Sequence, residues 1–132
     1  MGMDFLFFLL PVDASPEGLW QRVGDNFGGC VLRVEKRDSE LVGLIAVLPE
    51  SMARAGWIEG DLKWRNITRD SGGAWRMQDL RKHYDTKTAT VIMVDYREYR
   101  LSLGFGGRLR LHTEGLPFFP DQRWMRFSAS NP

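Results

Sequence analysis

Cysteine and histidine are scarce in this 132-residue chain, which has one cysteine, Cys30, and two histidines, His83 and His112. A single cysteine cannot form an internal disulfide, so the sequence gives no sign of a secreted, disulfide-linked protein. The chain also lacks the closely spaced cysteine and histidine pairs, and the HExxH motif, that hold zinc. We therefore expect no metal ion and no cofactor, and we expect Cys30 to be a buried structural thiol.

Long hydrophobic runs are absent as well. The longest apolar run covers residues 5–12, whereas a helix that crosses a bilayer needs about 20 apolar residues. The residues before this run include Asp4 and no lysine or arginine, which argues against a secretory signal peptide. These features predict a cytoplasmic protein that has no membrane partner.

Net charge is close to zero, at +1, but the two halves of the chain differ. Residues 1–60 carry a formal charge of −4, and residues 61–132 carry +5. One interpretation is that the halves pack together, or that two subunits meet head to tail, and neutralise each other. The alternative is a basic surface that binds an anionic partner. The near-zero total favours the first interpretation.

Large aromatic side chains are plentiful, with five tryptophans and eight phenylalanines. Side chains of this size need a core or an interface. A chain of this length can bury enough surface to fold without cross-links, and it contains no repeat, linker or low-complexity tract. We therefore expect residues 1–132 to form a single globular domain.

A helix is predicted over residues 16–27. Ser15 can cap its first turn and Pro16 suits the first helical position, while the Gly28-Gly29 pair is typical of a helix end. Between these limits, apolar side chains recur at the spacing of a helix face, at Leu19, Trp20, Val23 and Phe27.

Strand patterns dominate the rest of the chain. Segments rich in β-branched or alternating apolar residues, bounded by turn residues, lie at residues 30–37, 41–48, 62–68, 74–80, 88–96, 99–105, 108–113 and 122–128. The apolar segment 3–10 is predicted as a strand covered on both faces, and a short helix is predicted near residues 50–56. Together these elements predict an α+β domain. Its large, mostly antiparallel curved sheet forms a partial barrel and carries the 16–27 helix on one face.

The hairpin predicted at residues 96–113 separates apolar from polar residues by strand alternation, so one face is inward and the other outward. The outward face carries a basic patch, formed by Arg100, Arg108, Arg110 and His112. Matching the two inward faces requires a loop with an odd number of residues, or a bulge. We predict a loop of residues 106–108, because a loop of residues 105–107 would place Glu98 beside Glu114, which is repulsive.

No set of side chains in the sequence has the arrangement that catalysis requires. His112 is predicted beside Ser102 on the polar face of the hairpin, but no residue is placed to orient the imidazole. The glycines at 104, 106 and 107 lack a following helix whose N-terminus would hold a phosphate. We therefore assign no catalytic residue, and the sequence favours a protein that is not an enzyme.

One short segment has a familiar pattern. Leu48-Pro49-Glu50 is followed by Gly56, by Gly60-Asp61 and by a strand containing Trp64. This order of strand, proline-initiated helix, Gly-Asp turn and strand resembles the half-barrel of the AbrB/SpoVT transcription factors. The helix is one residue shorter than in that family, which rotates its last turn by about 100°. The resemblance therefore implies local structure alone, and the DNA-binding role of that family is not carried over.

Three functions are compatible with these features. We expect a non-catalytic binding or interaction domain that forms a homodimer or larger homo-oligomer through apolar residues, namely Phe5, Phe7, Phe8, Phe118 and Phe119. The first alternative is a small-ligand-binding domain or enzyme, with an apolar pocket between the 16–27 helix and the sheet. The residues predicted to line that pocket are Trp20, Trp64, Trp75, Met77 and Met93. The second alternative is nucleic-acid binding through the basic patch. It is the least favoured, because adjacent aromatic and basic residues of a strand point to opposite faces.

Overall fold

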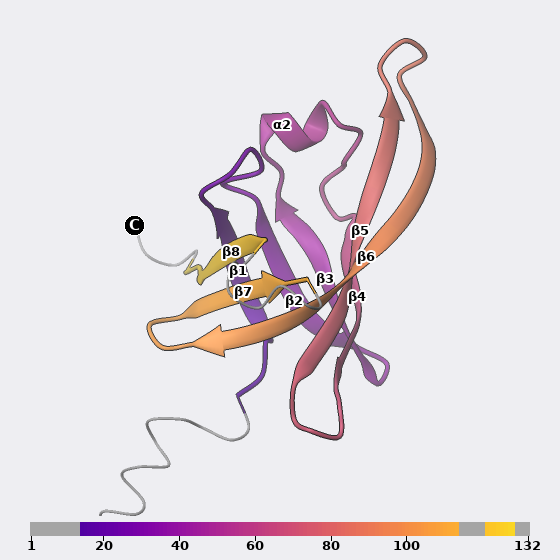
Figure 1. The fold of residues 1–132 in the computed structure, drawn as a ribbon. Coiled ribbons are helices and arrows are strands. Elements are labelled where there is room, and N and C mark those ends of the chain that lie inside the picture. The colour runs from indigo at the N-terminus through magenta and orange to yellow at the C-terminus, as the bar shows by residue number, and fades with distance from the viewer. Residues whose placement is uncertain (1–13, 114–120, 129–132) are drawn as a thin grey trace, which may run out of the picture.

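A computed structural model describes residues 14–113 and 121–128 of the chain. These residues form eight antiparallel strands in a closed barrel, in which each strand pairs with the next and the last pairs with the first (Figure 1). The strands are β1 (Gly18–Val23), β2 (Val31–Arg37), β3 (Glu40–Val47), β4 (Leu62–Arg69), β5 (Trp75–Asp85), β6 (Thr90–Gly104), β7 (Arg108–His112) and β8 (Gln122–Arg126). The predicted strand 3–10 and the predicted self-association residues Phe5, Phe7, Phe8, Phe118 and Phe119 lie outside the described residues.

The predicted α+β fold is wrong. The described part of the chain is all-β, and its one helix, α2 (Glu50–Ala53), has four residues. The predicted helix at 16–27 is instead strand β1 followed by a turn. β1 pairs with β2 on one side and with β8 on the other, and this tertiary pairing outweighs the local helical pattern. Gly24 and Gly29 have φ values of 86° and 94°, which suit a turn and not a helix interior.

The short helix predicted near residues 50–56 is confirmed in position, but it is shorter. Pro49 precedes the first turn, and α2 ends after Ala53 in a turn that reaches Gly56, whose φ is 92°. The predicted partial barrel is a complete one, because β8 closes the sheet onto β1. No helix of the described residues is long and apolar enough to cross a membrane.

The barrel interior is filled with large side chains. Eight strands enclose a space just wide enough for side chains or one small ligand. Trp64 and Trp124 meet edge to face, with ring centroids 4.9 Å apart, and leucine, isoleucine and methionine side chains surround them. The largest fully buried members are Trp20, Trp64, Trp124, Leu32, Ile45, Met77, Leu109 and Leu111. Most of the barrel is therefore a packed core and not a hollow cup.

Contacts between the first and last strands hold the barrel closed at one end. The guanidinium of Arg126 lies 4.1 Å from the ring centroid of Trp20 and donates a hydrogen bond of 2.6 Å to the carbonyl of Glu17. Trp20 in turn donates its indole N–H to the carbonyl of Pro16, at 2.7 Å. The opposite end carries the loop after β1, the helix α2 and the loop that follows it, so the two ends of the barrel differ.

Strands β5 and β6 are longer than the barrel and continue beyond it as a two-stranded ribbon. We call residues 81–95 the arm. β5 pairs with β4 as far as Asp79, and β6 pairs with β7 from Arg100 onward, so the strands of the arm pair with each other alone among the described residues. In Figure 1 the arm projects at the same end of the barrel as α2. The predicted strands 88–96 and 99–105 are thus one continuous strand.

The predicted register of the β6–β7 hairpin is wrong. Gly104 pairs with Arg108 and Leu103 pairs with Leu109, so the loop consists of residues 105–107. Gly106 and Gly107 have φ values of 74° and 71°, a conformation that glycine adopts without strain. The loop therefore uses both glycines for its turn, and this local geometry outweighs the charge argument that favoured residues 106–108.

Candidate functional site

We call the end of the barrel that carries α2 the open end. It contains a cavity of about 250 Å³. Its walls come from seven places in the sequence: β1, the loop after β1, the segment after α2, the start of β4, the middle of β5, the middle of β6 and the start of β8. The lining combines five cationic side chains with a single carboxylate, which are Arg22, Lys63, Arg81, Lys82, Arg97 and Asp79. Phe27, Ala55, Trp57, Tyr99 and Gln122 complete it.

A buried ion pair forms the floor of this cavity. Lys63 and Asp79 are 3% and 4% exposed, and they are the two charged residues that are buried in the described part of the chain. The Lys63 ammonium lies 2.6 Å from Asp79 Oδ1 and donates a second hydrogen bond, also of 2.6 Å, to the carbonyl of Leu80. A buried charge needs such partners, because desolvation otherwise makes it costly.

The second oxygen of Asp79 is also engaged. Gln122 Nε2 donates to Asp79 Oδ2 at 2.9 Å, and the indole N–H of Trp124 donates to Gln122 Oε1 at 3.1 Å. This chain of hydrogen bonds fixes the orientation of the Gln122 amide and extends the polar floor into the aromatic core. Both carboxylate oxygens of Asp79 therefore have hydrogen-bond partners, so neither is free to accept a proton as a base.

Three of the other four cations have carboxylate partners that lie outside the cavity lining. Arg81 makes two hydrogen bonds to Asp95, at 2.9 and 3.1 Å. Lys82 lies 2.7 Å from Asp61, and Arg22 lies 2.8 Å from Asp25, again as ion pairs. These carboxylates lie outside the cavity lining, and they hold in place the cations that line it.

Arg97 differs from the other four cations. It lies directly opposite Asp79 in the β5–β6 register, yet no carboxylate within residues 14–113 and 121–128 forms an ion pair with it. Burial raises the pKa of its neighbour Tyr99, and the negative charge of Asp79 adds to this effect, whereas a hydrogen bond with Arg97 opposes it. Tyr99 is thus a neutral hydroxyl beside an arginine that has no carboxylate partner among these residues.

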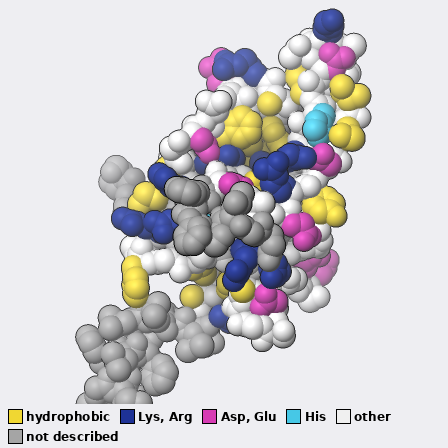
Figure 2. Space-filling model, viewed as in Figure 1, with side chains coloured by type: hydrophobic (Ala, Val, Ile, Leu, Met, Phe, Trp, Pro, Cys, Tyr) yellow, Lys and Arg dark blue, Asp and Glu magenta, His cyan; other side chains and the backbone are white. Residues whose placement is uncertain are grey.

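Aromatic rings position the cations of the cavity. The ammonium groups of Lys63 and Lys82 lie 4.7 and 4.8 Å from the ring centroid of Trp57, and the guanidinium of Arg22 lies 5.3 Å from that of Phe27. Such contacts stabilise a cation without neutralising it. Figure 2 shows Lys and Arg side chains gathered at the base of the arm, next to hydrophobic side chains below α2.

The described lining is rich in cationic side chains. Five cations line the cavity; four of them have carboxylate partners, and Arg97 has none among the described residues. Within residues 14–113 and 121–128, no serine, threonine, cysteine or histidine lines this cavity.

Four of the five residues predicted to line an apolar pocket pack in or against the barrel core, and Met93 lies apart from them. Trp20, Trp64 and Met77 are buried in the barrel core. Trp75 lies at the start of β5, where Arg69 stacks 5.3 Å from its ring, and Met93 is exposed on the arm. The helix that was to cover this pocket is absent, because residues 16–27 form β1 and a turn. The pocket at the open end shares none of these five residues.

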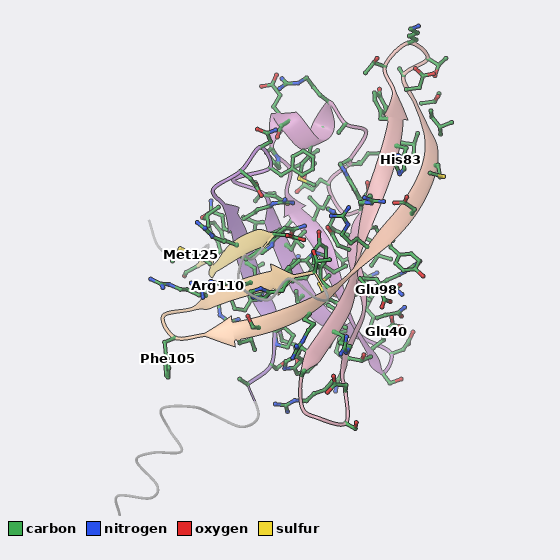
Figure 3. The ribbon with its side chains drawn as sticks, viewed as in Figure 1. Glu40, His83, Glu98, Phe105, Arg110 and Met125 are labelled. Atoms are coloured by element: carbon green, nitrogen blue, oxygen red, sulfur yellow. The ribbon has the colours of Figure 1, made fainter. Side chains whose placement is uncertain are left out.

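The predicted basic patch does share one outer face. Arg100 pairs with His112, Ser102 pairs with Arg110, and Gly104 pairs with Arg108 across the β6–β7 ladder. Arg123 of β8, which the sequence patterns missed, lies directly opposite Arg110. A groove of about 460 Å³ runs along this face, lined by Val23, Arg108, Leu109, Arg110, Arg123, Trp124 and Met125 (Figure 3).

The remaining candidates for chemistry have structural explanations. Ser102 Oγ lies 3.4 Å from His112 Nε2, as predicted, but no carboxylate orients the imidazole within the described residues. Cys30 is fully buried, and burial raises its pKa to about 11, so it is a poor nucleophile. No group of three or more His, Cys, Asp or Glu side chains that could hold a metal ion is found in the described part of the chain.

A signal for the cavity does exist in the sequence. The inward positions of β5 run through Trp75, Met77, Asp79 and Arg81, so the apolar alternation becomes charged as the strand leaves the core. A carboxylate at an inward strand position marks either a polar interior or a site. Its partner Lys63 is distant in sequence, and no pattern around Lys63 indicates the pairing.

Comparison of the chain with models of known protein families, with curated proteins and with solved structures found no match in any of the three.

Proposed function

We propose that this protein binds a small organic anion at the open end of its barrel. The observation that carries the proposal is Arg97, which lines a cavity with four other cations and, unlike them, has no carboxylate partner among the described residues. A molecule with one or two carboxylate or phosphate groups fits this charge. The cavity, about 250 Å³, lies below the usual range of about 300–1,000 Å³ for drug-sized ligands, which favours a small metabolite-sized anion.

Arg97 is the side chain proposed to contact the anion most directly. It lines the cavity without a carboxylate partner among the described residues, so binding does not require an existing ion pair to break. The neutral hydroxyl of Tyr99 lies beside it and can donate a hydrogen bond to the same ligand group. Lys82 and Arg22 are neutralised by Asp61 and Asp25, so they add hydrogen-bond donors to the site and little net charge.

The buried Lys63–Asp79 pair shapes the proposed site, but it is not proposed to contact the anion. Since Lys63 and Asp79 neutralise each other, they shape the cavity and hold Gln122, and, among the described residues, the unpaired positive charge of the lining is that of Arg97. Trp57 and Phe27 supply apolar surface for the carbon skeleton of a ligand. This mixture of apolar walls and a few convergent polar groups is typical of small-molecule sites.

Titration calorimetry with matched probes tests the proposal. Benzoate and succinate are compared with benzamide and succinamide, which have nearly the same shape and no charge, and inorganic phosphate is added as a third anion. Charge-assisted hydrogen bonds contribute about 1.5–3 kcal/mol, so at least one anion should bind roughly tenfold or more tightly than its neutral analogue. Equal binding of charged and neutral probes, or no binding of any anion, would contradict the proposal.

A matched pair of variants locates the site. Arg97→Gln removes the arginine without a carboxylate partner from the cavity, whereas Arg33→Gln makes the same charge change on the exposed outer side of β2. We expect Arg97→Gln to weaken anion binding by roughly tenfold and Arg33→Gln to leave it unchanged. Equal effects of the two variants would indicate a general electrostatic attraction and not a site.

We propose, as a second candidate, that the outer basic face binds an extended phosphate polymer such as single-stranded nucleic acid. The opposed Arg110 and Arg123 support it, because like charges directly across a ladder are destabilising unless an anion neutralises them. Binding of a labelled oligonucleotide should then weaken steeply with salt, and the double variant Arg110→Gln, Arg123→Gln should remove it. Absence of binding at low salt would reject this candidate.

A further inference from the structure

The arm exposes a run of apolar side chains to solvent. Ile92 is 70% exposed, Met93 and Val94 are each 52% exposed, and Val91 and Tyr96 are also exposed. Five of the ten large hydrophobic side chains that are exposed in the described residues therefore lie on one stretch of β6. Because neighbouring strand residues point to opposite faces, this run exposes apolar side chains on both faces of the ribbon, and such exposed apolar surface often marks an interaction site.

The same stretch of β6 also has a backbone edge that pairs with no other strand of the described residues. From Thr90 to Tyr99, β6 pairs with β5 on one side, and its pairing with β7 on the other side starts only at Arg100. No other described strand pairs with this part of β6. Residues 90–94 carry no charge and are rich in β-branched side chains, which makes this edge a template for a further strand.

Contacts near its base join the two strands of the arm to each other and to the segment after α2. Arg81 and Asp95 form a bidentate pair across the ribbon, and His83 Nε2 lies 3.0 Å from the same carboxylate. Lys82 donates to the carbonyl of Gly56 at 2.9 Å. The outer part of the ribbon extends beyond these contacts (Figure 3, where His83 is labelled). A two-stranded ribbon is marginally stable by itself, and three or more strands are needed for independent stability.

We propose that the β6 edge of the arm pairs with the same edge of a second copy of this chain, antiparallel about a two-fold axis near Met93. This arrangement makes a four-stranded sheet from two arms, and it places Ile92 of each copy opposite Val94 of the other. A two-fold interface brings identical surfaces together, and this uncharged surface is complementary to itself.

Charge selects the β6 edge over the β5 edge. The arm segment of β5 contains Arg81, Lys82 and His83 in succession, so a two-fold pairing of β5 with itself would bring cations together, which is unfavourable. A pairing of β6 with the β5 edge of another copy would leave free edges at both ends and would not close. Pairing of β6 with β6 covers the apolar run and closes the assembly as a dimer.

Sedimentation measurements on the full chain test this inference. Across micromolar concentrations the wild-type protein should form a dimer. Ile92→Lys should raise the dissociation constant of the dimer by roughly tenfold or more, because it places two like charges at the centre of the interface. Phe105→Lys is the matched control, since Phe105 is 64% exposed at the opposite end of the barrel, and it should leave the dimer unchanged.

The outcomes separate the possible occupants of the edge. A wild-type protein that stays monomeric at high micromolar concentration would overturn the proposal, whether another protein or another segment of this chain covers β6. A dimer that Ile92→Lys does not weaken would assign dimerisation to a different surface and would also overturn it. Neither result depends on anion binding at the barrel end.

Cysteine crosslinking tests the register. Met93→Cys should form an intersubunit disulfide under mild oxidation, because paired residues across strands have Cα atoms about 4.5–5.5 Å apart. Cys30, the single native cysteine, is fully buried with a pKa of about 11 and should not interfere. Phe105→Cys is the control and should remain uncrosslinked. Equal crosslinking of the two variants would refute pairing at Met93.

Discussion

Asp79→Asn removes one charge from the buried ion pair of the cavity floor with little change of shape. In the wild-type protein the Lys63 ammonium has three partners: Asp79 Oδ1 at 2.6 Å, the Leu80 carbonyl at 2.6 Å and the face of Trp57 at 4.7 Å. The variant keeps an amide oxygen in place but leaves the Lys63 charge without a counter-ion. Removing one partner of a buried ion pair costs about 3–5 kcal/mol. Because the Leu80 carbonyl and the Trp57 ring remain, we expect a loss of about 3 kcal/mol.

Urea unfolding followed by tryptophan fluorescence measures this loss. The unfolding midpoint should fall by roughly 1–3 M, given m-values of about 1–3 kcal/mol per molar urea. Glu50→Gln is the control, because it removes one charge from the exposed Glu50–Arg54 pair, and exposed pairs typically contribute about 0.3–0.5 kcal/mol at this helical spacing. If Asp79→Asn costs no more than Glu50→Gln, the account of the floor as a desolvated ion pair is refuted.

A double variant separates the charge from the packing. Lys63→Met combined with Asp79→Asn removes both charges and keeps a long side chain above Trp57. Neutral replacements of a buried pair are often close to neutral in stability, so the double variant should be more stable than Asp79→Asn alone. A double variant that is less stable than Asp79→Asn would show that Lys63 contributes mainly through its other contacts.

The remaining predictions concern single residues outside the cavity. Gly43→Ala should destabilise the barrel by about 1–3 kcal/mol, because a Cβ at Gly43 would lie 2.9 Å from the Cβ of Trp64; an unchanged melting temperature would contradict this packing. Cys30 should react with a disulfide reagent at pH 8 only after denaturation, because burial raises its pKa to about 11; rapid labelling of the native protein would count against its burial. Hydrogen bonds from the backbone N–H of Ala74 and then from Arg76 lower the pKa of Asp70 below 3.8. Ionised Asp70 therefore stabilises the fold above its unfolded-state pKa, and this stabilisation is lost as the pH falls through the folded-state pKa. An NMR titration of Asp70 with a midpoint at or above 3.8 would refute this assignment.

The strands were predictable where their sequence pattern is local. Segments 30–37, 41–48 and 62–68 match β2, β3 and β4 to within one residue at each end, because alternation and turn residues are sufficient to define them. The prediction of a helix at 16–27 was wrong because the contacts that decide this segment are not local. Its apolar spacing fits a helix, but the partners that make it a strand, β2 and β8, are supplied by tertiary pairing, and β8 lies about 100 residues away along the chain.

The site was less predictable than the fold, because its residues are brought together only by closure of the barrel. Arg22 comes from β1, Lys63 from β4, Arg97 from β6 and Gln122 from β8. Single-sequence patterns describe neighbours along one strand, so they found Arg100, Arg108, Arg110 and His112 on one hairpin face. They could not identify Arg123, which joins that face through the β7–β8 ladder.

Binding of a small anion among the cations of the open end is the central claim, and NMR mapping tests it most directly. The wild-type protein, labelled with ¹⁵N, is titrated with succinate while its backbone and indole resonances are followed. The account predicts shifts at the Trp57 indole and at the amides of Arg97, Tyr99 and Gln122, which line the cavity. The indole of Trp75, at the opposite end of the barrel, should not move. Shifts confined to the outer face of β7 and β8, or no saturable shifts at all, would contradict the claim.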